Sequence, residues 1–165
     1  MNQAIKIKNG VGDFWQTPKD LFAEINNEFF IGTPFDPCPG KIKLINSYSA
    51  EDFDDDPEKD GLKLEWHGEN FVNPPFSDIP TWVERAWASV ASHKKTIMLL
   101  PVRSDQEWFH DFVDLVCFIR GRVQYVFPGQ KRKGCSFPSC LLFFGFSAFP
   151  RTWYPECHKN RRKKK

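Results

Sequence analysis

The spacing of apolar residues changes repeatedly along this chain between that of a helix and that of a strand. Apolar residues recur every three or four positions in two segments, which predict helices over residues 19–30 and 79–90, and a third helix with a capped start is predicted over residues 103–110. Short apolar runs around these segments predict strands at residues 33–36, 69–72, 94–101 and 115–119. The run from Ile97 to Leu100 contains no polar residue, which is typical of a central strand buried on both faces.

This alternation of strand and helix, from residue 18 to residue 119, predicts an α/β fold with a doubly wound, mostly parallel sheet. Two later strands are predicted at residues 120–127 and 141–146. The segment between them leaves little room for a helix, so we expect an antiparallel hairpin at the edge of the sheet. We divide the chain into a loose lead-in (1–12), a single domain (13–150) and a basic C-terminal tail (151–165).

Composition narrows the class of protein. The chain has 165 residues, enough for one domain with a buried core, and it has no apolar run of the roughly 18–20 residues that cross a membrane. Its first residues lack the pattern of a secretion signal. The five cysteines form no Cys-x-x-Cys pair, and the four histidines do not fall at the spacing of metal ligands. We therefore expect a cytosolic protein with reduced thiols, no metal and no membrane partner.

The net charge of +2 is unevenly distributed. The segment from Lys159 to Lys165 carries six positive charges and no acid, which leaves 17 basic and 21 acidic residues, or −4, in the remainder. A basic segment on an acidic body is typical of a flexible arm that contacts nucleic acid, although a tail that aids solubility has the same composition. A basic loop with Lys131, Arg132 and Lys133, together with Arg122, predicts further contacts with phosphates.

The segment Asn73-Pro74-Pro75-Phe76 directly follows an apolar strand. Proline cannot continue a sheet and holds the preceding residue extended, so the chain leaves the sheet here in a rigid turn. The turn presents an amide, stiff backbone carbonyls and an aromatic face. These groups can hold a flat heterocycle with an exocyclic amine, whose hydrogens the Asn73 oxygen and a proline carbonyl accept while the ring stacks on Phe76. The alternative is an ordinary strand exit in which Phe76 packs a corner.

Other segments predict a neighbouring pocket. In Trp15-Gln-Thr-Pro18, Thr17 and the proline predict the cap and first residue of a helix, and the segment is also predicted to line a ligand pocket. Asp36 ends a predicted strand, where ligands bind in open α/β sheets, although an aspartate there also caps its own turn. Residues 46–60 are predicted as an acidic, solvated loop, except that Asp60 starts a turn into an apolar segment.

Taken together, these segments resemble the small phage-type (Dam-like) DNA N6-adenine methyltransferases over roughly residues 14–145. The tetrapeptide matches the family signature of Asn, Asp or Ser followed by two prolines and an aromatic residue. The matching motifs, in chain order, are Trp15-x-Thr17-Pro18, Phe35-Asp36-Pro37, Asp60-Gly61-Leu62 with Trp66, Phe71-Val-Asn-Pro-Pro-Phe-Ser77, Leu100-Pro101, Trp108-Phe109-His110 and Gly121-Arg122. Several motifs in the family's order are far more specific than any one of them.

The resemblance implies a Rossmann-like class I methyltransferase fold and transfer of a methyl group from S-adenosylmethionine to N6 of adenine in double-stranded DNA. It implies that Asn73, Pro74, Pro75 and Phe76 hold a base flipped out of the duplex. It implies that the cofactor pocket is lined by Trp15, Thr17, Pro18, Asp36, Pro37 and Asp60. It also implies a phage- or prophage-encoded protein in the cytoplasm of a bacterial host, and we expect a monomer.

Two features depart from the commoner pattern of such enzymes. The glycine-rich turn of many S-adenosylmethionine sites is replaced by Asp36-Pro-Cys-Pro-Gly40, and Phe76 stands where tyrosine is commoner. The signature also serves methylation of other amines, such as cytosine N4, an RNA base or a protein glutamine. A non-catalytic nucleic-acid-binding module of the same fold is the alternative from another class.

Overall fold

The computed structural model describes residues 15–40, 48–49, 60–113, 115–126 and 135–162. Its described strands form one sheet in the order β2-β1-β3-β4-β6-β5-β7. The strands are β1 (Phe35–Asp36), β2 (Tyr48–Ser49), β3 (Glu69–Val72), β4 (Lys95–Pro101), β5 (Val116–Ile119), β6 (Ser139–Phe144) and β7 (Thr152–Trp153). The helices are α1 (Lys19–Phe29), α2 (Ile79–Ser89), the 3-10 turn η3 (Val90–Ser92), α3 (Glu107–Asp111) and α4 (Glu156–Arg162).

The sheet is mixed and mostly parallel, as predicted. The pairs β1–β2, β1–β3, β3–β4 and β5–β7 are parallel, whereas β6 is antiparallel to both of its neighbours, β4 and β5. The antiparallel strand therefore lies inside the sheet. Its six residues are all buried, in agreement with partners along both of its edges.

The predicted edge hairpin of strands 120–127 and 141–146 is wrong. Residues 120–126 contain no strand, and Val126 forms only an isolated bridge with Gln16. The apolar side chains of Val123 and Tyr125 are instead buried against the α1 side of the sheet. The alternating apolar residues that predicted a strand are therefore buried without forming one. The strand that pairs with β6 at this position is β5.

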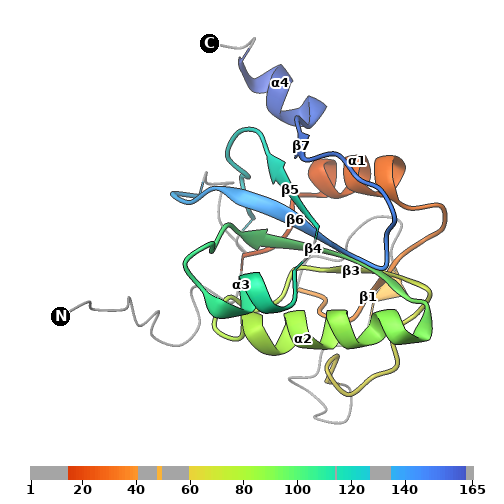
Figure 1. The fold of residues 1–165 in the computed structure, drawn as a ribbon. Coiled ribbons are helices and arrows are strands. Elements are labelled where there is room, and N and C mark those ends of the chain that lie inside the picture. Colours follow the sequence, from red (N-terminus) through yellow and green to blue (C-terminus); the bar gives the residue numbers. More distant parts are fainter. Residues whose placement is uncertain (1–14, 41–47, 50–59, 114, 127–134, 163–165) are drawn as a thin grey trace.

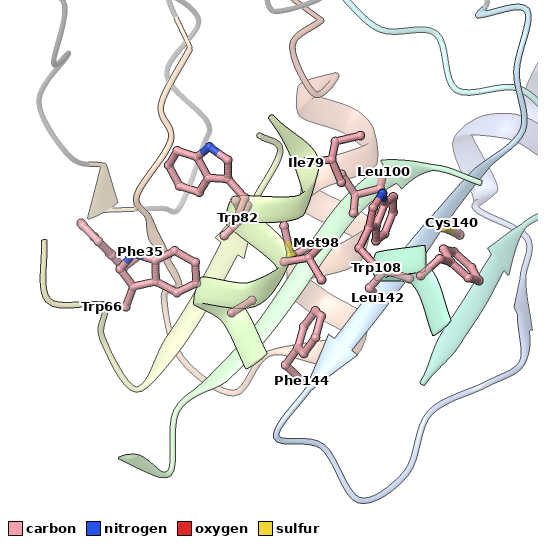
Figure 2. Close-up of a cluster of buried hydrophobic side chains, with 14 residues drawn as sticks. Phe35, Trp66, Ile79, Trp82, Met98, Leu100, Trp108, Cys140, Leu142 and Phe144 are labelled. Atoms are coloured by element: carbon pink, nitrogen blue, oxygen red, sulfur yellow. The ribbon is translucent and has the colours of Figure 1, made fainter. Parts of the chain in front are cut away.

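Helices cover both faces of the sheet, with α1 on one side and α2 and α3 on the other (Figure 1). Successive residues of β4 point to opposite faces, so Ile97 and Leu99 pack with α1, whereas Met98 and Leu100 pack with α2 and α3. Figure 2 shows the second of these cores, in which Trp82 of α2 lies beside Met98. This two-sided burial explains the uninterrupted apolar run that predicted a central strand.

The C-terminal segment differs from the expected flexible arm. β7 pairs with β5, and the first turn of α4 is held by α1, because the carboxylate of Glu24 accepts hydrogen bonds from the backbone N–H of Glu156 (2.6 Å) and Cys157 (2.8 Å). Such a carboxylate satisfies N–H groups that a helix start leaves unpaired. The basic residues at the end of the chain therefore follow a segment anchored to the sheet. Among the described helices, none is long and apolar enough to cross a bilayer.

Candidate active site

The order of the strands reverses between β1 and β3. After β1 the chain adds β2 on one side of it, whereas after β3 the chain adds β4 on the other side of the sheet. Asp36 ends β1, and Asn73 directly follows β3. Since Phe35 is aligned with Asn70, Asn73 lies two residues, or about 7 Å, beyond Asp36 along the strand direction. Open α/β sheets bind ligands at such a reversal, outside the carboxyl ends of the strands.

The side chain of Asn73 is held in one orientation. Its Nδ2 donates a hydrogen bond of 2.5 Å to the backbone carbonyl of Trp15. Its Oδ1 is buried and has no hydrogen-bond partner among the residues that the structure describes. The amide nitrogen thus has a hydrogen-bond partner, whereas the oxygen remains able to accept a hydrogen.

The segment from Trp15 to Thr17 joins distant parts of the site. Gln16 exchanges two backbone hydrogen bonds with Val126, of 3.0 and 2.9 Å. The Gln16 side chain is buried against Gly40, where an added Cβ would lie only 2.3 Å from Nε2. The segment thus connects the turn after β1 with the region before β6, and places the Trp15 carbonyl beside Asn73. Nothing in the local sequence predicted these contacts.

Phe76 belongs to a cluster of four aromatic rings, which we call the aromatic cluster: Trp15, Phe76, Tyr125 and Phe137. Phe76 contacts Tyr125 and Phe137 edge to face, with ring centroids 5.9 and 5.8 Å apart. Trp15 contacts the same two rings at 5.5 and 5.9 Å. Each such pair contributes about 0.5–1.5 kcal/mol beyond burial, so the cluster holds the half-buried Phe76 ring in place.

Tyr125 and Phe137 were not among the predicted site residues. Tyr125 is fully buried, its hydroxyl lies 3.3 Å from Ser139 Oγ, and burial raises its pKa far above the usual value, so the phenol stays neutral. The two rings come from the segments on either side of residues 127–134. Their only sequence signal is that both are aromatic residues near the basic loop, which is too common a pattern to identify a site.

Asp36 and Asp60 each close their own turn. Asp36 is buried, and its Oδ1 accepts a hydrogen bond of 3.0 Å from the backbone N–H of Cys38, as the capping alternative expected. Asp60 Oδ1 accepts one of the same length from Leu62. The two turns touch, because a Cβ on Gly61 would lie 1.8 Å from the carbonyl oxygen of Pro37. The predicted cofactor-binding residues Asp36, Pro37 and Asp60 are thus brought together.

The predicted capping role of Thr17 is wrong. Pro18 is itself the N-cap of α1, since it is extended and its carbonyl accepts the N–H of Phe22, and no side chain caps the helix. The Thr17 hydroxyl is buried and has no partner among the described residues. An unsatisfied buried polar atom costs about 1–3 kcal/mol. Thr17 Oγ1 and Asn73 Oδ1 are two such atoms among the described residues, and each is able to form a hydrogen bond with a ligand.

The structure describes one of the four predicted DNA-binding residues. Arg122 is exposed after β5, whereas Lys131, Arg132 and Lys133 lie outside the described residues.

Burial raises the pKa of Cys117 to about 11 and that of Cys140 to about 12, so both thiols are protonated at neutral pH and are poor nucleophiles. No cluster of three metal-ligating side chains occurs within the described part of the chain.

Comparisons with known proteins indicate the family of the chain. The model of the family described as DNA N-6-adenine-methyltransferase (Dam) matches residues 4–165. A protein named DNA N-6-adenine-methyltransferase from Haemophilus phage HP1 (strain HP1c1) is 28% identical over 140 residues, which is 80% of this chain and 78% of the phage protein. No solved structure is a significant match.

Proposed function

This chain belongs to the DNA N-6-adenine-methyltransferase (Dam) family, and from this premise we propose that it methylates N6 of an adenine flipped out of duplex DNA, with S-adenosylmethionine as methyl donor. The observation that carries the proposal is the Asn73 amide, whose Nδ2 is bound by the Trp15 carbonyl and whose buried Oδ1 has no partner among the described residues. An acceptor prepared in this way suits an exocyclic amine, which has two hydrogens to donate.

Asn73 and Pro74 orient the amine in this proposal. The Asn73 oxygen accepts one amine hydrogen and the Pro74 carbonyl accepts the other, which localises the nitrogen lone pair for attack. Phe76 stacks on the base, and the rings of Tyr125 and Phe137 prevent it from turning away. Trp15, which the sequence assigned to the cofactor pocket, acts as a positioning residue through its carbonyl and its ring contacts. Catalysis by these residues consists of orientation and polarisation, with no covalent enzyme intermediate.

The residues around the strand reversal fit S-adenosylmethionine, which when bound supplies a methyl group on a positively charged sulfur. Thr17 offers a buried hydroxyl without a partner among the described residues, and the touching turns of Asp36-Pro37 and Asp60 offer carboxylates and backbone groups. Negative charge there suits a positively charged cofactor. We propose that Thr17, Pro18, Asp36, Pro37 and Asp60 hold it.

The strand order supports a Rossmann-like class I sheet, with β6 as the inserted antiparallel strand. The phage origin of the HP1 relative motivates our proposal that the protein is phage- or prophage-encoded and works in the cytoplasm of a bacterial host. We also propose that it acts as a monomer.

The substrate is tested by incubating the purified protein with labelled S-adenosylmethionine and adenine-containing duplex DNA, followed by mass spectrometry of the nucleosides. We expect N6-methyladenine. N4-methylcytosine would assign the site to a different amine, and label in RNA or protein would remove DNA as the substrate. A protein that binds the cofactor but labels none of these would contradict the proposed reaction.

Thr17→Val tests the cofactor pocket. The substitution replaces a buried hydroxyl that has no partner among the described residues with a methyl group of similar shape. We expect the free energy of unfolding to stay constant or rise by up to about 1 kcal/mol, while the affinity for S-adenosylmethionine falls roughly three- to tenfold through loss of one hydrogen bond. Thermal unfolding and calorimetry measure the two effects separately.

Thr17→Ser is the matched control for this pair of measurements, because it retains the hydroxyl. It should bind the cofactor as the wild-type protein does. A Thr17→Val variant that unfolds more easily and binds with unchanged heat would make Thr17 a structural residue. Absence of binding heat in the wild-type protein would instead favour the non-catalytic nucleic-acid-binding module.

A further inference from the structure

The charge of this chain changes sign near residue 115. Residues 1–114 carry 11 lysines and arginines and 20 acids, whereas residues 115–165 carry 12 lysines and arginines and a single acid, Glu156. These two parts have net charges of −9 and +11. The second part forms β5, β6, β7 and α4, which together make up one end of the sheet (Figure 1). Among the residues that the structure describes, those before residue 114 carry 6 lysines and arginines and 12 acids, and those after it carry 6 lysines and arginines and one acid, so the described strands at this end belong to the basic part of the chain.

The positive end shares an edge with the proposed active site. β3 and β5 run in the same direction, because β4 is parallel to β3 and β6 is antiparallel to both β4 and β5. Arg120, which directly follows β5, therefore lies at the same carboxyl edge as Asn73, which follows β3. α4 follows β7, which is parallel to β5, so α4 begins at this edge as well.

α4 is fixed to the turn after β5. His158 Nδ1 lies 3.1 Å from the carbonyl oxygen of Arg120, and the backbone N–H of Arg120 donates to the carbonyl of Trp153 at 2.8 Å. Gly121 adopts a φ of 99°, and a Cβ at this position would lie 3.0 Å from His158 Nδ1. Together with the carboxylate of Glu24 at its first turn, these contacts give α4 a defined position relative to the active-site edge.

Two cations are gathered at this junction. The Arg120 guanidinium lies 5.0 Å from the centre of the Tyr154 ring, and the Lys159 ammonium lies 5.5 Å from the same centre. Arg120 is exposed, and the Lys159 side chain is 41% exposed. Cation–π contacts hold both groups in place, and the Glu156 carboxylate also pairs with Lys159. A phosphate laid across the two cations would contact Arg120 and compete with Glu156 for Lys159.

We propose that Arg120 and Lys159, on the junction of β5, β7 and α4, bind the phosphate backbone of the DNA duplex next to the flipped adenine. This junction surface, as we call it, deepens the proposed function and rests on it. Its position at the carboxyl edge allows a duplex to reach both these cations and Asn73, while the acidic first part of the chain repels DNA from the opposite end of the sheet. The duplex is thus directed to one side of the site.

The test is the salt dependence of duplex binding, measured by fluorescence anisotropy without methyl donor between about 50 and 200 mM salt. The double variant Arg120→Gln/Lys159→Gln should bind more weakly. The slope of log K against log salt should become shallower by about 0.9 for each phosphate that the variant no longer neutralises, or about 1.8 for both cations. A variant with a native unfolding temperature and an unchanged slope would overturn the proposal.

Lys94→Gln is the matched control. It removes one positive charge just before β4, at the opposite edge of the sheet, where Lys94 pairs with the exposed Glu65 at 3.3 Å. Its salt slope should equal that of the wild-type protein. An equal decrease in the slope for Lys94→Gln would show a general charge effect and would count against a specific junction surface.

Glu156→Gln gives an effect of opposite sign. It removes the single acid of the second part of the chain, whose carboxylate pairs with Lys159, so duplex affinity at about 150 mM salt should increase. Unchanged or weaker binding would contradict a phosphate at Lys159. Binding of anionic lipid vesicles, with no loss of duplex binding in the double variant, would replace DNA by a membrane as the partner. The binding assay contains no methyl donor, so its result does not depend on the methylation assay. A wild-type protein that fails to methylate DNA would contradict the proposed function and would leave the test of the junction surface unchanged.

Discussion

Asn73→Ala is expected to lower kcat for adenine methylation by about a hundred- to a thousandfold while the protein stays folded. The substitution removes the acceptor that orients the target amine, and loss of one such preorganised group has an effect of this size. Its structural cost is small, because Asn73 makes a single hydrogen bond to Trp15 in the described part of the chain, and such a bond contributes about 0.5–1.5 kcal/mol. Single-turnover kinetics and thermal unfolding measure the two effects.

Asn70, which lies in β3 three residues before Asn73, offers a control. Asn70 is fully buried, its Oδ1 accepts from the backbone N–H of His67, and its Nδ2 donates to the carbonyls of His67 and Lys95. Asn70→Ala should therefore lower the free energy of unfolding by about 2–4 kcal/mol, since several buried groups lose their partner, and leave kcat nearly unchanged at temperatures where it is folded. If Asn73→Ala retained full turnover, the proposed role of its amide would be wrong.

Gly61→Ala is expected to weaken both the fold and the proposed cofactor pocket. A Cβ at this position would lie 1.8 Å from the carbonyl oxygen of Pro37 and 3.0 Å from the ring of Trp82. The first neighbour is backbone, so no change of rotamer relieves the clash, and the turns of Asp36 and Asp60 must separate. We expect a loss of about 1–3 kcal/mol in the free energy of unfolding, with weaker binding of S-adenosylmethionine, measured by chemical unfolding and calorimetry.

Gly68 provides the comparison for this substitution. A Cβ on Gly68 meets no described atom within 4 Å, and its backbone does not need a positive φ. Gly68→Ala should change the free energy of unfolding by less than about 0.5 kcal/mol and leave cofactor binding unaltered. Equal behaviour of the two variants would show that the contact between the turns has no part in the pocket.

Several elements of the fold could be predicted because their signals are local. The spacing of Leu21, Phe22 and Ile25 predicted α1, and the apolar run of β4 predicted a strand buried on both faces, which the two cores confirm. Two prolines after Val72 predicted where β3 ends. Each of these inferences depends on sterics or periodicity within a few residues.

Pairing of distant segments could not be predicted in the same way. Residues 120–126 have an alternating apolar pattern and β5 is a short apolar run, so both resemble strands, and nothing in their sequences shows which of them pairs with β6. Thr17 carried the signal of a helix cap, but Pro18 took that position and left the hydroxyl unpaired among the described residues. The basic C-terminal segment looked like an arm because its anchor, Glu24, lies more than 130 residues earlier.

Residue types at short spacings were enough to predict the alternation of helices and strands, the rigid turn of Asn73 to Phe76 and the family resemblance. Which groups surround that turn depends on the tertiary structure. It placed the Trp15 carbonyl on Asn73 Nδ2, so that the amide presents its oxygen, and it gathered Tyr125 and Phe137 around Phe76. Contacts between residues about 50 or more positions apart arise from the packing of the whole sheet, and no local pattern encodes them.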